Sequence, residues 1–182
     1  MFDFLKKILL TIMLAAIPFV STAQEKCPEY MFYIDKSDNK NVLYYAIKMD
    51  EKDKEKINSK KPLDIYWIMY AEKGQREGFA IGEEGQFGIK HKEIEKGTKF
   101  IINVNSKLLN KRDITITLKE NGCAEAVTKI EGKEAILKSI SIDIPSKSFG
   151  LPNVSHLDIK GAALANGSEL NERVINPDYK AK

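Results

Sequence analysis

Short runs of alternating apolar and polar residues, separated by turn residues, dominate most of the chain. Successive side chains of a strand point to opposite faces, so this period of two predicts strands with one buried face. No long run has the 3.6-residue spacing of an amphipathic helix. The pattern therefore predicts about nine or ten strands, at residues 30–35, 42–49, 63–70, 87–94, 98–105, 111–118, 123–130, 133–144, 154–160 and 170–175.

Turn signals between these runs favour pairing of neighbouring strands. Residues 37–41 read Ser-Asp-Asn-Lys-Asn, and Glu131-Gly132 separates two later runs. Such residues accept the backbone angles of tight turns, which predicts hairpins. Strands without long helices are best buried against other strands. We expect one all-β domain over residues 24–182, folded as an antiparallel β-barrel or β-sandwich.

The first 23 residues have a different pattern. Lys6 and Lys7 precede an apolar run over residues 8–20, and Ser21 and Ala23 follow with small side chains. This order is that of a secretory signal peptide. The apolar run is shorter than the roughly 20 residues that span a bilayer, although an uncleaved anchor is an alternative. We expect residues 1–23 to be removed and the mature chain, periplasmic or secreted, to carry no transmembrane segment.

Composition narrows the classes of partner. The chain has 29 basic and 26 acidic residues, a net charge of +3, and the two signs are interleaved. No basic stripe is present, so nucleic acid is not an expected partner. The sequence implies no cofactor, and it names neither a ligand nor a partner protein.

The chain has two cysteines, Cys27 and Cys123. In an exported protein such a pair favours a disulfide, which would tie the mature N-terminus to the middle of the chain. Closing so long a loop would stabilise the fold by about 4 kcal/mol on a chain-entropy argument. The alternative is one buried thiol and one thiol on a frayed terminus. Redox catalysis is not expected, because no Cys-x-x-Cys is present.

Several segments together resemble an uncharacterised family of exported bacterial proteins, domain of unknown function 4833. The most specific is Pro62-Leu63-Asp64-Ile65-Tyr66-Trp67-Ile68. The others are Phe32–Ser37, Asn39–Tyr45, Phe87–Lys90, Ala126–Thr128 with Gly132-Lys133, and Leu157–Gly161. The resemblance covers nearly all of the mature chain. It implies a single β-rich domain outside the cytoplasm, and it implies no activity and no catalytic residues.

Both histidines stand two residues before a carboxylate, as His91 with Glu93 and His156 with Asp158. Residues two apart on a strand share a face, so each pair offers two metal ligands. A His/carboxylate metal site would form if the two strands were neighbours. The alternative is that all four are surface residues.

Catalytic motifs are scarce. The chain has no Gly-x-Ser-x-Gly elbow, no phosphate-binding glycine-rich loop and no His-Glu-x-x-His. Three aspartates, Asp35, Asp64 and Asp143, lie among apolar strand residues and are candidates for a paired-carboxylate hydrolase. The alternative for each is an outward-facing strand position.

Tyrosines form another candidate site. Tyr33, Tyr44, Tyr66 and Tyr70 alternate with the strongest apolar stripes, so they are expected on the opposite sheet face. Tyrosine suits binding sites because it combines an apolar ring with a polar tip. A second core layer is the alternative. These features favour a non-enzymatic envelope protein that binds a small apolar or amphipathic ligand or a partner protein. The competing hypothesis is an envelope hydrolase that uses carboxylates or the His/carboxylate site.

Overall fold

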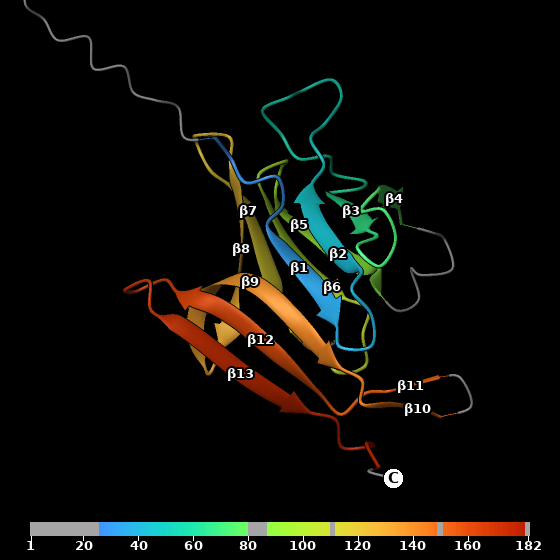
Figure 1. Ribbon diagram of the computed structural model, residues 1–182. Helices are drawn as coiled ribbons and strands as arrows, with labels where there is room; N and C mark the ends of the chain where they lie inside the picture. The colour runs from blue at the N-terminus through green and yellow to red at the C-terminus, as the bar shows by residue number, and fades with distance from the viewer. Residues whose placement is uncertain (1–25, 80–86, 110–111, 149–150, 181–182) are drawn as a thin grey trace, which may run out of the picture.

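The computed structural model describes residues 26–79, 87–109, 112–148 and 151–180, and its regular elements are thirteen β-strands (Figure 1). Ten of them correspond to the runs expected from the sequence. The additional three are three-residue strands: β4 (Arg76–Gly78), β10 (Ser146–Ser148) and β11 (Leu151–Asn153). The expected all-β fold class is confirmed. The predicted signal peptide, residues 1–23, lies outside the described residues.

The long strand β9 (Lys133–Asp143) is the centre of the sheet. Along one edge it pairs first with β8 (Ala124–Ile130) and then with β1 (Phe32–Lys36). Along its other edge it pairs with β12 (His156–Ala163), which in turn pairs with β13 (Glu169–Ile175). The sheet therefore forks at β9 into two wings.

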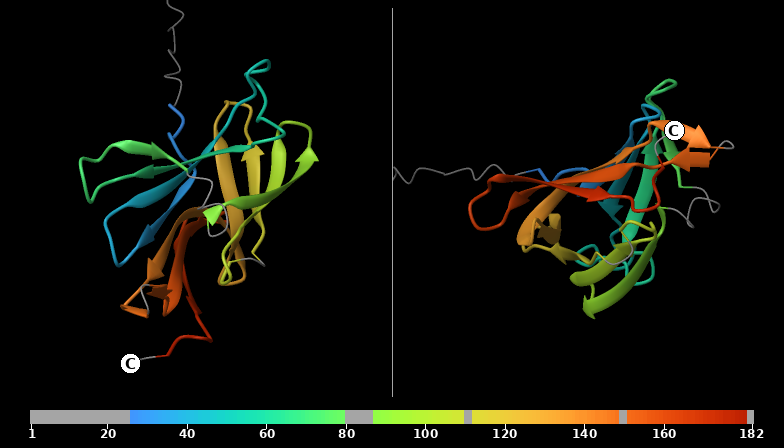
Figure 2. Two further views of the ribbon diagram at one scale, coloured as in Figure 1. Left: turned by 90° about the vertical axis from the view of Figure 1, so that its right-hand side faces the viewer. Right: turned by 90° about the horizontal axis from the view of Figure 1, so that it is seen from below.

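The first wing consists of β1, β2 (Val42–Ile47), β3 (Leu63–Ile68) and β4, in that order outward from β9. The second wing consists of β8, β7 (Ile114–Leu118), β6 (Lys99–Val104) and β5 (Ile89–Glu95). Figure 2 shows the two wings diverging from the strand they share. Together they form a curled, mixed sheet that resembles half of a barrel.

Two features differ from a regular antiparallel barrel. The pairing of β1 with β9 is parallel, whereas the other described strand pairs are antiparallel. Parallel pairing is possible here because about 100 residues separate the two strands, which leaves ample chain for the connection. The barrel is not closed, since the described sheet ends at β4 on one wing and at β5 on the other.

Most of the core lies between the two wings. Phe32 and Tyr45 stack with ring centroids 4.5 Å apart and are fully buried on the inner face of the first wing. Phe100 and Ile116 are equally buried on the second wing. The inward residues belong to one hydrophobic cluster. Burying one such side chain contributes roughly 1.5–3 kcal/mol, so this cluster supplies the main stabilisation.

A disulfide joins Cys27, which precedes β1, to Cys123, which precedes β8. The predicted pairing is confirmed, and the two cysteines are 96 residues apart in sequence. Both cysteines precede the residues at which their wings meet β9, Val127 of β8 and Tyr33 of β1, so the bond lies where the two wings are apart. It therefore ties the two wings together at the point where backbone pairing does not. Structural disulfides are typical of proteins outside the cytoplasm.

The described residues contain no helix that is long and apolar enough to cross a membrane.

Candidate functional site

A pocket of about 560 Å³ lies at the end of the half-barrel where β1 and β9 finish. Its apolar lining comes from the core side of the sheet and from the segments next to it. The apolar lining residues are Phe87, Leu108, Ile142, Ile144, Pro152, Val154 and Leu157. Polar side chains surround this apolar part: Lys36, Asp38, Asn105, Ser106, Lys107, Asn153, Asn176 and Asp178. Ligand pockets in proteins combine an apolar lining with a few polar groups in this way.

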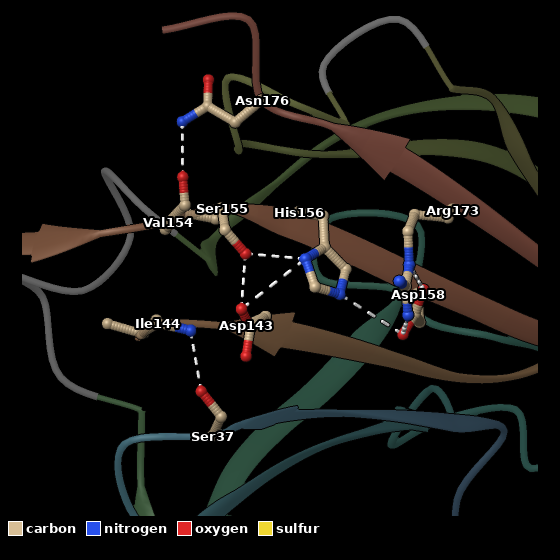
Figure 3. Close-up of polar contacts among 9 residues, drawn as sticks. All are labelled: Ser37, Asp143, Ile144, Val154, Ser155, His156, Asp158, Arg173 and Asn176. Carbon is tan, nitrogen blue, oxygen red and sulfur yellow. Dashed lines mark hydrogen bonds and ion pairs between the residues drawn. The ribbon is translucent and has the colours of Figure 1, made fainter. Parts of the chain in front are cut away.

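Hydrogen bonds fix several walls of this pocket. The hydroxyl of Tyr45 donates to the carbonyl of Phe87 at 2.8 Å, and burial raises the pKa of Tyr45, which keeps that donor protonated. The side-chain amide of Asn176 donates to the carbonyl of Val154 at 2.7 Å. The backbone N–H of Ile144 donates to the hydroxyl of Ser37 at 2.7 Å (Figure 3). The pocket is therefore held in shape by neighbouring strands.

The rim carries charges of both signs. Lys107 pairs with Asp178, and the ammonium of Lys147 lies 3.2 Å from the carboxylate of Asp38. The ammonium of Lys36 lies 4.7 Å from the ring centroid of Trp67, a cation–π distance. Since Lys36 lines the pocket, this places a positive charge beside its apolar lining.

The predicted tyrosines lie on the outer face of the first wing, away from the core. In the sheet register Tyr33 is the partner of Tyr44, and Tyr44 is the partner of Tyr66. The ring centroids of these two pairs are 5.8 Å and 5.6 Å apart. The hydroxyls of Tyr44 and Tyr70 lie 3.4 Å apart, so the four tyrosines form one cluster. Their role in ligand binding stays a prediction.

Neighbouring side chains cover part of this tyrosine cluster. The ring of Tyr30, which is not one of the four predicted tyrosines, packs with its centroid 4.5 Å from that of Tyr44. The guanidinium of Arg76 lies 3.5 Å above the ring of Tyr66 and also pairs with Asp64 at 2.6 Å. Burial, and then the hydrogen bond with Tyr70, raise the pKa of Tyr44. Exposed aromatic surface is thus concentrated at Tyr30 and Tyr70, which are 36% and 52% exposed.

Polar side chains converge where β12 begins (Figure 3). The hydroxyl of Ser155 donates to the carboxylate of Asp143 at 2.5 Å and lies 2.6 Å from Nδ1 of His156. Nε2 of His156 faces Asp158 at 3.6 Å. Arg173 donates two 2.8 Å hydrogen bonds to Asp158, which hold the pKa of that carboxyl below its usual range. The cluster therefore links β9, β12 and β13.

A serine beside a histidine invites comparison with nucleophilic catalysis. A nucleophilic serine gives its proton to the imidazole that activates it. Here the Ser155 hydroxyl donates its one proton to Asp143. Its oxygen therefore accepts a hydrogen bond from Nδ1–H of His156. This direction does not favour a serine nucleophile. The carboxylate or metal hydrolase stays a prediction.

The two predicted histidine pairs lie on strands that are not neighbours. His91 and Glu93 are on β5, which pairs with β6, whereas His156 and Asp158 are on β12, which pairs with β9 and β13. Glu93 accepts hydrogen bonds from the N–H of Gly97 at 2.6 Å and from Ser59 at 2.8 Å, and both lower its pKa. Within the described ranges, no group of three or more histidine, cysteine or acidic side chains is arranged to hold a metal ion.

The structure does bring together other candidates. Asp35, Asp143, His156 and Asp158 line one hollow on the outer face of the sheet. Asp64 lies apart from them, beside Arg76.

Comparison with known proteins identifies the family. A family model described as a domain of unknown function (DUF4833) matches residues 32–173. The chain belongs to the DUF4833 family. The resemblance noted in the sequence is thereby confirmed. No curated protein and no solved structure gives a match.

No pattern in the sequence of this DUF4833 chain predicted the pocket at the end of the half-barrel. Its lining comes from the end of β1, Phe87, the segment after β6, the end of β9 and the segments around β12 and β13. Leu157 and Phe87 belong to segments that carry the family resemblance, but both appeared there only as apolar strand residues. Asn176, which directly follows β13, is hydrogen-bonded to the carbonyl of Val154 and was not among the residues that the sequence suggested for a site.

Proposed function

We propose that the mature chain works outside the cytoplasm as a non-enzymatic binding module for a small amphipathic ligand. The observation that carries this proposal is the pocket of about 560 Å³ at the end of the half-barrel, with its apolar lining and polar rim. Its volume falls in the range of about 300–1,000 Å³ that is common for small-molecule sites.

Two observations support a location outside the cytoplasm. Residues 1–23 have the order of a secretory signal peptide, with basic, apolar and small-residue parts. Cys27 and Cys123 are joined by a disulfide, which an oxidising compartment maintains.

The lining indicates which kind of ligand fits. The rings and branched chains of Phe87, Ile142 and Leu157 exclude water from an apolar body and gain free energy by burial. The polar head would stay at the rim, near the ammonium of Lys36 and the amide of Asn153. This arrangement suits a compact molecule with one apolar part and one hydrogen-bonding end.

Filling the pocket tests the proposal. The side chain introduced by Val154→Trp should occupy the space beside Ile144 and compete directly with the apolar part of a ligand. The affinity for an amphipathic probe, 1-anilinonaphthalene-8-sulfonate, should therefore fall by about tenfold or more. The control is Val174→Trp, since Val174 is also a half-buried valine but does not line this pocket. Probe fluorescence gives the affinity, and native mass spectrometry of protein from the exported fraction reveals any bound molecule.

Two results would contradict the proposal. The first is equal probe affinity for Val154→Trp and Val174→Trp, with both variants as stable as the parent chain. The second is a bare polypeptide mass in the exported fraction together with undetectable probe binding. That outcome would favour a partner protein as the binding target.

A further inference from the structure

A second hollow, of about 480 Å³, lies on the outer face of the sheet over β1, β9 and β12. Ser141 forms its floor, because in the register it stands between Asp35 on β1 and Asp158 on β12. The side chain of Ser141 is short, whereas the longer side chains of Asp143 and His156 also line the hollow. The hollow therefore lies on the outer surface of the sheet, and of its lining residues Lys36 and Ile142 also line the pocket on the core side.

Some polar groups of this hollow are already fixed. Asp143 and His156 are held by Ser155, and Asp158 is held by Arg173. Because these side chains are already held in place, they lose little further conformational entropy when a ligand binds.

Other polar groups of the hollow are free to bind. In residues 26–79, 87–109, 112–148 and 151–180, no hydrogen bond or ion pair engages the side chain of Asp35, Lys40 or Ser141. A carboxylate accepts two hydrogen bonds, an ammonium donates three, and a hydroxyl does both. The free groups therefore offer donors and acceptors side by side.

The charges of the hollow nearly balance. The carboxylates of Asp35 and Asp143 face Lys40 and His156, and the carboxylate of Asp158 pairs with Arg173. Strong selection for an anion or a cation would require an excess of one sign. Closely spaced donors and acceptors of both charges instead suit a neutral molecule with many hydroxyl groups.

Aromatic rings adjoin the hollow. Tyr33 precedes Asp35 by two residues on β1, so both side chains stand on the same face. The ring of Tyr33 contacts that of Tyr30 at 6.2 Å, and Tyr30 is 36% exposed. A pyranose ring has hydroxyls around its edge and C–H groups on its face. The C–H face packs on an aromatic ring while the hydroxyls hydrogen-bond to polar side chains.

We propose that this outer hollow binds a neutral pyranose unit of an oligosaccharide, with its hydroxyls at Asp35 and Ser141 and its C–H face towards Tyr33 and Tyr30. The proposal goes beyond the amphipathic ligand of the core-side pocket. It uses the opposite face of the sheet, so an experiment that contradicts one of the two proposals leaves the other unaffected.

Two variants test the site, with cellohexaose and the hexamer of N-acetylglucosamine as probes. Ser141→Leu fills the floor of the hollow, and Asp35→Ala removes its free carboxylate. Each should weaken oligosaccharide binding by about tenfold or more, Asp35→Ala because it removes one hydrogen bond to a charged group and Ser141→Leu because its side chain occupies the space of the sugar. Thr117→Leu is the control, because Thr117 is a half-buried strand residue of the second wing that does not line the hollow.

Calorimetry on the full mature chain measures affinity, and amide chemical shifts locate the bound sugar. The expected result is binding of at least one probe, with shifts around Ser141 and Asp35, lost in both variants and kept in Thr117→Leu. Absence of binding by both probes at millimolar concentration would overturn the proposal. So would unchanged binding by Asp35→Ala and a folded Ser141→Leu, or shifts confined to the core-side pocket around Val154.

Discussion

Replacing Gly161 with alanine should destabilise the fold by about 3 kcal/mol, because the added methyl group has no room. A Cβ at Gly161 would lie 2.4 Å from the carbonyl oxygen of Ile136 and 2.6 Å from Cδ1 of Ile130. The first contact is with backbone, which cannot rotate away as a side chain does. Urea unfolding of the parent chain and the variant, at equal slope, measures the loss.

Gly78→Ala is the matched control. Gly78 is also in a strand, but a Cβ there would meet nothing within 4 Å, so its change should stay within about 0.5 kcal/mol. If the Gly161 variant were no less stable than this control, β12 would have to lie farther from β9 than the structure places it.

The tight approach at Gly161 arises from a bulge that also reorients β9. The register between β12 and β9 shifts at Lys160/Gly161, where Lys160 pairs with Ser139 and Gly161 pairs with Leu137. Lys138 is therefore the extra residue of β9. An extra residue reverses which side chains face the core and bends the strand. The bulge lies where β9 passes from β8 to β1, so it accompanies the fork of the sheet.

This bulge marks the limit of what alternation predicts. The sequence pattern places Ile136, Ile140, Ile142 and Ile144 on one face. In the structure the last three are buried, but Ile136 is not, and Leu137 is buried in its place. The positions of strands follow from period-two patterning, because that period is a local property. An inserted residue changes the phase without changing composition, so the pattern of β9 alone does not reveal it.

The candidate sites also differ in whether they follow from local sequence or from the pairing of distant strands. The pairing of Tyr33 with Tyr44 follows from a hairpin with a short turn, which is local in sequence. The hollow over Ser141 depends on the parallel pairing of Asp35 with Ser141, two residues more than 100 positions apart. Alternation contains no information on which distant strands pair. The same limit explains why His91 and His156 were considered together although the structure places them on different parts of the sheet.

Removing the disulfide should cost about 4 kcal/mol of stability, since its loop is long. Cys27 and Cys123 are 96 residues apart, so the bond restricts a large part of the unfolded chain. The native state also loses a constraint, because the bond joins the two wings where they have separated from β9. The measurement is urea unfolding of the oxidised chain and of a Cys27→Ser, Cys123→Ser double variant.

Reduction provides the control for this prediction. The oxidised parent chain treated with a thiol reductant should unfold at the midpoint of the double-serine variant, whereas the variant itself should not respond to reductant. Equal midpoints for the oxidised chain and the variant would contradict the prediction, and would mean that the unfolded chain is already compact between residues 27 and 123.

Tyr30 adds a local readout, because it lies three residues after Cys27 and its ring packs against Tyr44. If the disulfide holds this segment in place, its loss should expose Tyr30 before the core unfolds, and tyrosine fluorescence should change at lower urea than the backbone signal.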